Sequence, residues 1–264
     1  MIARNRLPAR AQYSALEARN ALNQRPSAAN HSLQIMLTIA DRLIGTKSRI
    51  AAAERAAGRP AGSVTLIAVS KTFNAEAVRA CAAAGQRAFG ENYVQEALEK
   101  IATLQALGLQ WHFIGPLQSN KTRPIAENFE WVHSVERERI ALRLDAARPA
   151  ALPPLNICIQ VNVSGETSKS GVAPHEVAAL AQAIRCLTRL RLRGLMAIPE
   201  PTVDTALRRR RFAMLRELQT ALIAQGHALD TLSMGMSGDL EEAIAEGATV
   251  VRVGTAIFGA RAKT

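Results

Sequence analysis

The sequence predicts a single (β/α)8 barrel of the TIM type, an α/β fold, preceded by one extra N-terminal helix. Three observations support this prediction. From residue 36 onward, short apolar runs rich in β-branched residues alternate with longer stretches of helical periodicity. There are eight such runs, and no linker or long irregular insert divides them. Eight consecutive βα units favour closure of a parallel sheet into a barrel. A doubly wound open sheet is the alternative, although no Gly-x-Gly-x-x-Gly motif follows the first run.

The elements are expected in a regular order along the chain. A helix near 36–57 comes first, and Gly58 and Pro60 mark its end. Each strand is predicted where an apolar run is bounded by turn-forming residues. The predicted strands are 65–70, 87–89, 111–114, 131–134, 156–163, 192–198, 231–234 and 250–253. The predicted helices between them lie near 74–84, 92–107, 119–128, 136–147, 174–188, 203–225 and 239–246.

Residues 1–35 differ in composition from the rest of the chain. They contain five arginines against the single acid Glu17, and they have no clean apolar period. We expect residues 1–35 to be a disordered basic extension, or to lie upstream of the true translation start at Met36. An arginine-rich targeting segment is a third interpretation. Residues 36–264 are then the barrel domain.

Cysteine content and hydropathy limit the classes of protein to which the chain can belong. Cys81, Cys158 and Cys186 are odd in number, far apart and without metal-ligand spacing. This pattern favours three small buried side chains in a reducing cytoplasmic compartment, with no metal site. No apolar run approaches the roughly 20 residues of a membrane-spanning helix, so no membrane association is expected.

The net charge of +11 includes a second basic cluster, in which Arg189, Arg191 and Arg193 precede residues 208–211, four consecutive arginines. Four consecutive arginines on a helix spread around its circumference and do not form one nucleic-acid-binding face. We therefore expect no nucleic-acid binding. Arg211 falls on the apolar side of that helix and is expected to extend toward solvent or to pair with an acid.

Polar and glycine residues gather where the predicted strands end, which is the functional face of a parallel barrel. Lys71 follows the first strand, and Asn92 follows the second. Ser237-Gly238 and Gly254-Thr255 follow strands seven and eight, where barrels often bind phosphate. The alternative is that these glycines only form turns and that Ser237 caps a helix.

A lysine at the mouth of a barrel, in partly apolar surroundings, loses its proton more readily and can form a Schiff base with a carbonyl. Facing a phosphate site, Lys71 fits two kinds of protein: an aldolase acting on a sugar phosphate, or a protein that binds pyridoxal 5′-phosphate (PLP). Arg252 lies on the same side of its strand as Gly254 and should point into the barrel. A buried arginine needs a partner, which could be a cofactor's pyridine nitrogen or Glu91.

Six stretches within roughly residues 36–262 carry recognisable motifs: LIAVSKTF, FGENYVQEALEK, WHFIGPLQSNKTR, VNVSGETSKSG, LRGLMAIPEP and LSMGMSGDLEEAIAEGATVVRVGTAIFGAR. Together they closely resemble the PLP homeostasis protein family, which is related to the N-terminal barrel of alanine racemase. The resemblance implies that Lys71 carries PLP as an internal aldimine and that Asn92 lies beside the ring. It further implies that Lys169 lies near the mouth as a second contact. The remaining implied contacts are Met234 on the cofactor face, Arg252 at the pyridine nitrogen, and Ser237, Gly238, Gly254 and Thr255 at the phosphate.

The function implied is binding of PLP for its intracellular homeostasis, with delivery to apo PLP-dependent enzymes by a monomer or weak dimer. Little or no turnover is expected, because an arginine at the ring nitrogen weakens the ring as an electron sink. The sequence also ends just after strand eight, without the second domain that racemases of this fold have. The alternative is a PLP-dependent amino-acid racemase, for which Lys169 and His112 are the candidate second acid/base residues. A nucleic-acid-binding or scaffold protein is a third hypothesis.

Overall fold

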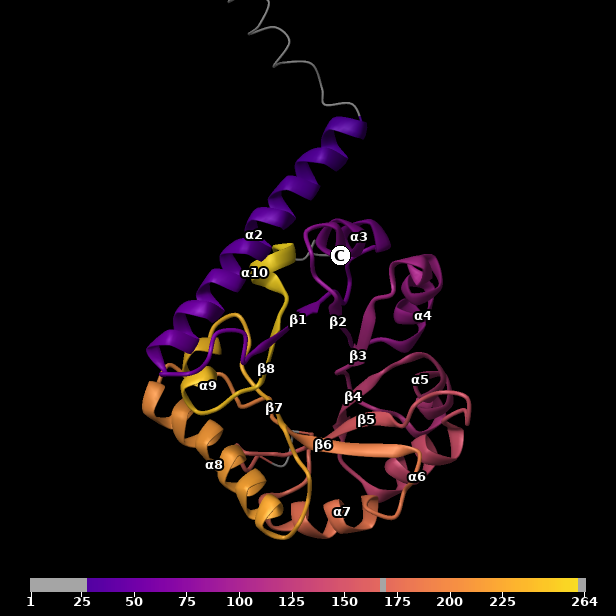
Figure 1. Cartoon of the computed structure of the whole chain (residues 1–264), viewed down its shortest axis with the longest axis vertical. Coiled ribbons are helices and arrows are strands. Elements are labelled where there is room, and N and C mark those ends of the chain that lie inside the picture. The colour runs from indigo at the N-terminus through magenta and orange to yellow at the C-terminus, as the bar shows by residue number, and fades with distance from the viewer. Residues whose placement is uncertain (1–27, 167–169, 261–264) are drawn as a thin grey trace, which may run out of the picture.

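The computed structural model describes residues 28–166 and 170–260, and the side chains from residue 38 onward. Eight parallel strands form a closed barrel in the order β1 to β8, and β8 pairs back with β1. Figure 1 shows the ring of strands with the helices outside it. The strands are β1 (Thr65–Val69), β2 (Ala88–Glu91), β3 (Gln110–Phe113), β4 (Trp131–Val135), β5 (Leu155–Gln160), β6 (Leu190–Met196), β7 (Thr231–Ser233) and β8 (Val250–Val253). The predicted (β/α)8 barrel is therefore confirmed.

Helices connect successive strands and cover the outside of the barrel. The α-helices are α2 (Ala28–Ala56), α3 (Ala75–Ala83), α4 (Val94–Thr103), α5 (Thr122–Asn128), α6 (Glu138–Ala147), α7 (Val177–Ile184), α8 (Thr205–Ala224), α9 (Leu240–Ala245) and α10 (Thr255–Phe258). Short 3-10 helices occupy Gln105–Leu107, Ser119–Lys121 and Pro174–Glu176. None of these described helices combines the length and apolar character needed to span a lipid bilayer.

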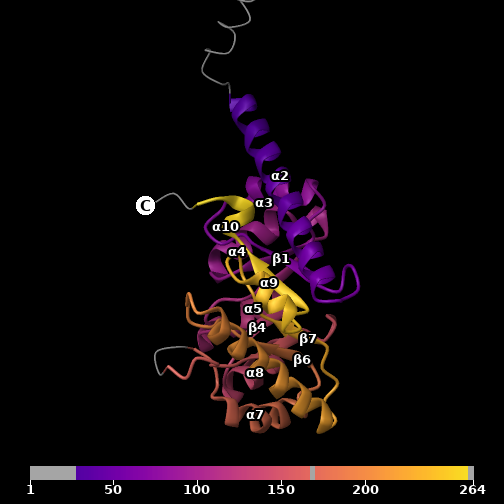
Figure 2. The same cartoon turned by 90° about the vertical axis from the view of Figure 1, so that its left-hand side faces the viewer.

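The extra N-terminal helix, α2, packs beside the seam where the first and last strands meet. It contacts α3, α9 and α10, and Arg49 of α2 forms an ion pair with Glu241 of α9. Figure 2 shows α2 extending beyond the barrel. The helix begins at Ala28 rather than near residue 36 as the sequence predicted. Residues 28–35 contain no proline or glycine to stop the helix, so it extends upstream. The rest of the expected basic extension, residues 1–27, lies outside the described residues.

Apolar side chains fill the space between strands and helices, and two smaller clusters contain strand residues only. One comprises Ile67, Ala88 and Val250, and the other Trp131, Cys158 and Met196. Strand residues that do not join the main core face the barrel interior, where side chains pack in layers. Of the cysteines, Cys81 and Cys158 are buried as expected, whereas Cys186 is exposed.

Acidic side chains form ion pairs with most of the arginines of helix α8. Arg208 pairs with Glu242, and Arg209 pairs with Glu246, both of which lie at α9. The expectation for Arg211 is confirmed, since this buried side chain contacts the Glu200 carboxylate at 3.3 Å. These pairs favour a structural role for the cluster over a surface for nucleic acid.

Candidate cofactor-binding site

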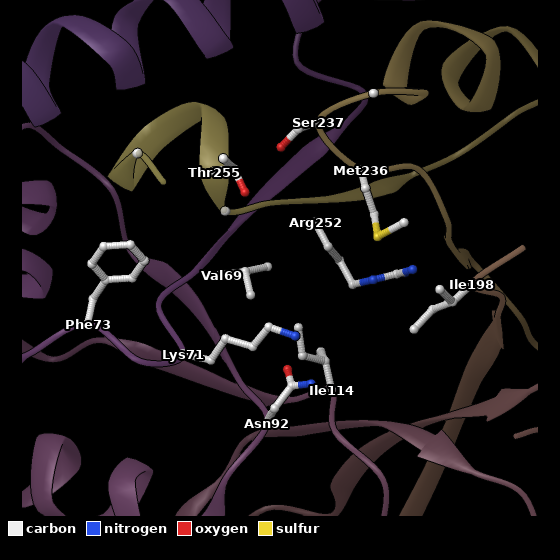
Figure 3. Close-up of a pocket in the computed structure, with 13 residues that line it drawn as sticks. Val69, Lys71, Phe73, Asn92, Ile114, Ile198, Met236, Ser237, Arg252 and Thr255 are labelled. Atoms are coloured by element: carbon white, nitrogen blue, oxygen red, sulfur yellow. The ribbon is translucent and has the colours of Figure 1, made fainter. Parts of the chain in front are cut away.

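A cavity of about 260 Å³ lies at the carboxyl ends of the strands. Seven of the eight site residues predicted from the sequence line it: Lys71, Asn92, Ser237, Gly238, Arg252, Gly254 and Thr255. Figure 3 shows Lys71 and Asn92 on one side of the cavity and Ser237 and Thr255 on another, with the Arg252 side chain reaching in from β8. Residues separated by more than 180 positions in sequence are thus gathered at one end of the barrel, as the fold requires.

The eighth predicted residue, Met234, does not line this cavity. Its side chain is fully buried in the main apolar core, and Met236 lines the cavity instead. Strand β7 ends at Ser233, and Gly235 adopts a positive φ of 94° just beyond it. This backbone conformation, which favours glycine, ends the alternation of the strand and brings Met236 to the cavity.

The backbone around Lys71 is held from both sides by an ion cluster that comprises Glu91, Glu96 and Lys100. The Lys100 Nζ donates to the Ser70 carbonyl at 2.8 Å, and the Thr72 amide donates to Glu96 Oε1 at 2.7 Å. Thr72 has a φ of 68°, a region that threonine rarely adopts. The cluster therefore stabilises an unfavourable turn immediately after Lys71.

Lys100 and Glu91 form the buried part of this cluster. Lys100 Nζ lies 2.7 Å from Glu91 Oε1 and 2.5 Å from Glu96 Oε1, and the Ser70 hydroxyl donates to Glu91 Oε1 at 2.6 Å. Burial raises the pKa of Glu91, and Lys100 opposes that shift. Glu91 is thus not the partner of Arg252 that the sequence allowed. Lys100 was missed by the sequence analysis, although the i,i+4 spacing of Glu96 and Lys100 is a signal for such a pair.

Asn92 is positioned by a close approach of the backbone after β3. A Cβ atom on Gly115 would lie 2.3 Å from the Asn92 carbonyl oxygen and 2.6 Å from its Cα. The Asn92 Oδ1 atom is buried and has no hydrogen-bond partner among the described residues. A buried amide oxygen without a partner at a cavity wall is available to a ligand's donor.

We expect Gly115→Ala to displace Asn92 and to weaken cofactor binding, because the added methyl group has no space. Overpacking of this kind lowers the free energy of unfolding by roughly 1–3 kcal/mol. Urea unfolding and titration with PLP measure the two effects. The matched control is Gly45→Ala in α2, where a Cβ would meet nothing within 4 Å. Unchanged PLP affinity in Gly115→Ala would contradict this account of Asn92.

The loops after β7 and β8 form the other side of the cavity. A Cβ on Gly238 would meet nothing within 4 Å, so there is open space beside this backbone. Thr255 begins α10 directly after Gly254. The alternative role for Ser237, capping the next helix, is not observed, since Asp239 is the N-cap of α9. Two hydroxyl-bearing residues and two glycines at one cavity wall are suited to phosphate oxygens.

Arg252 is 3% exposed and crosses the floor of the cavity. Its Nη1 donates to Ser233 Oγ at 2.6 Å, and its Nη2 donates to the Ala197 carbonyl at 2.9 Å. Burial lowers the pKa of Arg252 to about 10, which leaves the guanidinium protonated at neutral pH. A guanidinium has five N–H groups, so donors remain for a ligand's acceptor.

Two buried histidines lie inside the barrel. His112 lies 3.0 Å from both His133 and the Gln110 side chain, and it does not line the cavity. Burial lowers the pKa of His112 to about 3 and that of His133 well below its usual value. This placement does not support His112 as an acid/base residue, and Lys169 lies outside the described residues.

The buried histidines predict loss of stability in mild acid. Well above pH 6.5 both imidazoles are neutral in the folded and unfolded states, so their contribution is constant. Below pH 6.5 the unfolded chain binds protons that the folded chain does not, and the free energy of unfolding falls. Between pH 7 and pH 5 the fall is about 2 kcal/mol for each imidazole.

Urea unfolding at the two pH values measures this effect in the wild type and in a His112→Leu/His133→Leu variant. Other groups, such as Glu91 and Glu130 with their raised pKa values, contribute equally to both proteins. Equal pH dependence in the two proteins would show that the histidines are not the cause.

Comparison with known proteins identifies the family to which the chain belongs. The family model described as "Alanine racemase, N-terminal domain" matches residues 46–262, which defines the class of barrel. The "Pyridoxal phosphate homeostasis protein" of Pseudomonas aeruginosa is 63% identical over 226 residues, covering 86% of this chain and 97% of the relative. The Escherichia coli K12 protein of the same name is 53% identical over 232 residues, covering 86% and 98%.

A solved structure with similar sequence and fold comes from Synechococcus elongatus. It is PipY with PLP bound, which is 41% identical, has a TM-score of 0.74, and covers 84% of this chain and 100% of its own. The chain belongs to the family of the pyridoxal phosphate homeostasis proteins.

Proposed function

We propose that this protein binds PLP in the cavity at the mouth of the barrel and holds it, exchangeably, for intracellular homeostasis of the cofactor. The observation that carries this proposal is the convergence of Lys71, Arg252 and the Ser237-Gly238 and Gly254-Thr255 loops on one cavity of about 260 Å³. The PLP bound to PipY and the names of the close relatives support the proposal.

The residues present fit this cofactor. Lys71 would hold PLP through its amine, and the bound cofactor would supply an aldehyde able to condense reversibly with a neutral amine, with loss of water. Lys71 provides the amine, and the glycine-containing loops provide space and hydroxyl groups for phosphate. Arg252 provides donors for the pyridine nitrogen, and the unpartnered Asn92 Oδ1 provides an acceptor.

The charges at the site favour a carrier over an enzyme. Lys71 and Arg252 are the ionisable side chains among the described residues that line the cavity. A two-base racemase needs a second acid/base residue on the other face of the ring. Arg252 remains protonated at neutral pH, so it would leave the nitrogen of a bound ring without a proton, and carbanions would be poorly stabilised. We infer little or no turnover, delivery of PLP to apo-enzymes, a cytoplasmic location and a monomeric or weakly dimeric state.

The test begins with apo-protein to which PLP is added and from which the excess is removed. The loaded protein is then mixed with an apo PLP-dependent enzyme, and recovery of that enzyme's activity measures transfer. The carrier proposal predicts transfer together with no loss of α-deuterium from a panel of labelled amino acids. Failure of the apo-protein to take up PLP would overturn binding, and deuterium loss that Lys71→Ala abolishes would establish an enzyme instead.

A further inference from the structure

A chain of four hydrogen bonds crosses the barrel interior and ends at Arg252 in the cofactor cavity. Arg252 Nη1 lies 2.6 Å from Ser233 Oγ, which lies 2.8 Å from His133 Nδ1. His133 Nε2 lies 3.0 Å from His112 Nδ1, and His112 Nε2 lies 3.0 Å from Gln110 Oε1. The chain connects strands β8 and β7 with β4 and β3, which are not adjacent to them in the barrel. All members except Gln110 are buried.

The direction of every bond in this chain follows from its chemistry. Arginine only donates, so the Ser233 oxygen accepts from Arg252. Burial keeps each imidazole neutral, with one N–H and one acceptor nitrogen. If His112 Nε2–H donates to Gln110 Oε1, then His112 Nδ1 must accept from His133 Nε2–H. His133 Nδ1 then accepts the Ser233 hydroxyl hydrogen, and every donor in the chain has an acceptor.

If the hydrogen bonds in the chain ran in the opposite direction, one donor would have no acceptor. His133 Nδ1–H would donate to Ser233, whose oxygen already accepts from Arg252. The Ser233 hydroxyl hydrogen would then have no acceptor among the described residues in this buried position, which is unfavourable. The first arrangement is therefore the stable one. Because it ends on an amide oxygen, which does not pass a proton on, the chain orients groups and does not conduct protons.

We propose that His133 and His112 are positioning residues for Arg252. By fixing the Ser233 hydroxyl hydrogen on His133, they leave the serine lone pairs directed to the guanidinium and hold it at the cavity floor. The role of the held guanidinium at the pyridine nitrogen rests on the proposed PLP function. The positioning of Arg252 is a property of the protein without its cofactor, so the two claims can be tested separately.

The first test uses the apo-protein labelled with nitrogen-15. Imidazole spectra are expected to show both histidines protonated at Nε2 and unprotonated at Nδ1. The Nη groups of Arg252 are expected to rotate slowly about the Nε–Cζ bond, and to rotate faster in Ser233→Ala and in His133→Leu. In His133→Asn the side-chain oxygen replaces Nδ1 as acceptor, so slow rotation should be retained. Either histidine in the opposite tautomer, or equal rotation in His133→Leu and the wild type, overturns the proposal.

The second test measures PLP affinity and the visible spectrum of the loaded protein. Loss of one hydrogen bond to a charged group is expected to weaken binding on the order of 10-fold in Ser233→Ala and His133→Leu, and to shift the absorption band. His133→Asn should remain close to the wild type. The matched control is Ser134→Ala, which removes a buried hydroxyl without a partner among the described residues.

The outcomes separate the two claims. Equal losses in His133→Leu and His133→Asn would indicate a packing role and overturn the positioning proposal. A wild-type protein that binds no PLP would overturn the proposed function, while the nitrogen-15 measurements still decide the positioning of Arg252.

Discussion

Lys71→Ala is expected to abolish the visible absorption band that the wild-type protein develops with PLP. The reason is that the band depends on covalent attachment to an amine, and Lys71 is the lysine that lines the cavity among the described residues. The measurement is an absorption spectrum of each purified protein after addition of PLP and removal of the excess. Borohydride, which reduces the covalent link, should erase the band of the wild type.

Lys121→Ala is the control for the loss of a lysine, because Lys121 is exposed and lies outside the cavity. Its spectrum should match that of the wild type. The Lys71→Ala protein should retain its fold, since the Lys71 side chain is only partly buried. Bands of equal strength in Lys71→Ala and in the wild type would show that Lys71 is not the attachment point.

The second large effect is expected from Lys100→Met. This change removes the cation beside Glu91, whose side chain is fully buried and whose Oε2 already has no partner among the described residues. Breaking a buried ion pair by removing one member lowers the free energy of unfolding by about 3–5 kcal/mol. PLP attachment should weaken as well, because Lys100 also holds the Ser70 carbonyl next to Lys71.

Urea unfolding measures the change in stability, and two further variants identify its cause. The Glu91→Gln/Lys100→Met double variant should recover much of the lost stability, since no uncompensated charge remains. Arg123→Met removes an exposed i,i+4 pair with Glu127 and should change the free energy of unfolding by less than about 1 kcal/mol. A Lys100→Met protein as stable as Arg123→Met would refute the role given to the buried cluster.

The strands were predictable because each one is a short apolar run between turn-forming residues, and all eight occur where the sequence placed them. The predicted positions of the strand ends were less accurate. The run predicted at 156–163 forms a strand only over Leu155–Gln160, because Val161 beyond it forms an isolated bridge with Val172 of the loop that follows. The predicted start of α2 was also wrong. The composition of the sequence changes at residue 36, but the helical propensity does not, and the helix begins at Ala28.

The candidate site was predictable where a residue lies within two positions of the end of a strand, as Lys71 and Gly254 do. The site was not predictable where the backbone turns between the end of a strand and the residue that lines the cavity. Gly235 reverses the alternation after β7, so Met236 replaces Met234 at the cavity. Contacts between strands that are distant in sequence could not be predicted either. Ser233 and His133 are 100 positions apart, and only closure of the barrel brings them within 2.8 Å.

The most direct test of the central claim is the position of the cofactor on the chain. The protein is loaded with PLP, reduced with borohydride and digested, and the modified peptide is identified by mass spectrometry. The account predicts a pyridoxyl group on Lys71 in the peptide that follows β1. A pyridoxyl group on a different lysine alone, or no modified peptide, would contradict the assignment of this cavity as the PLP site.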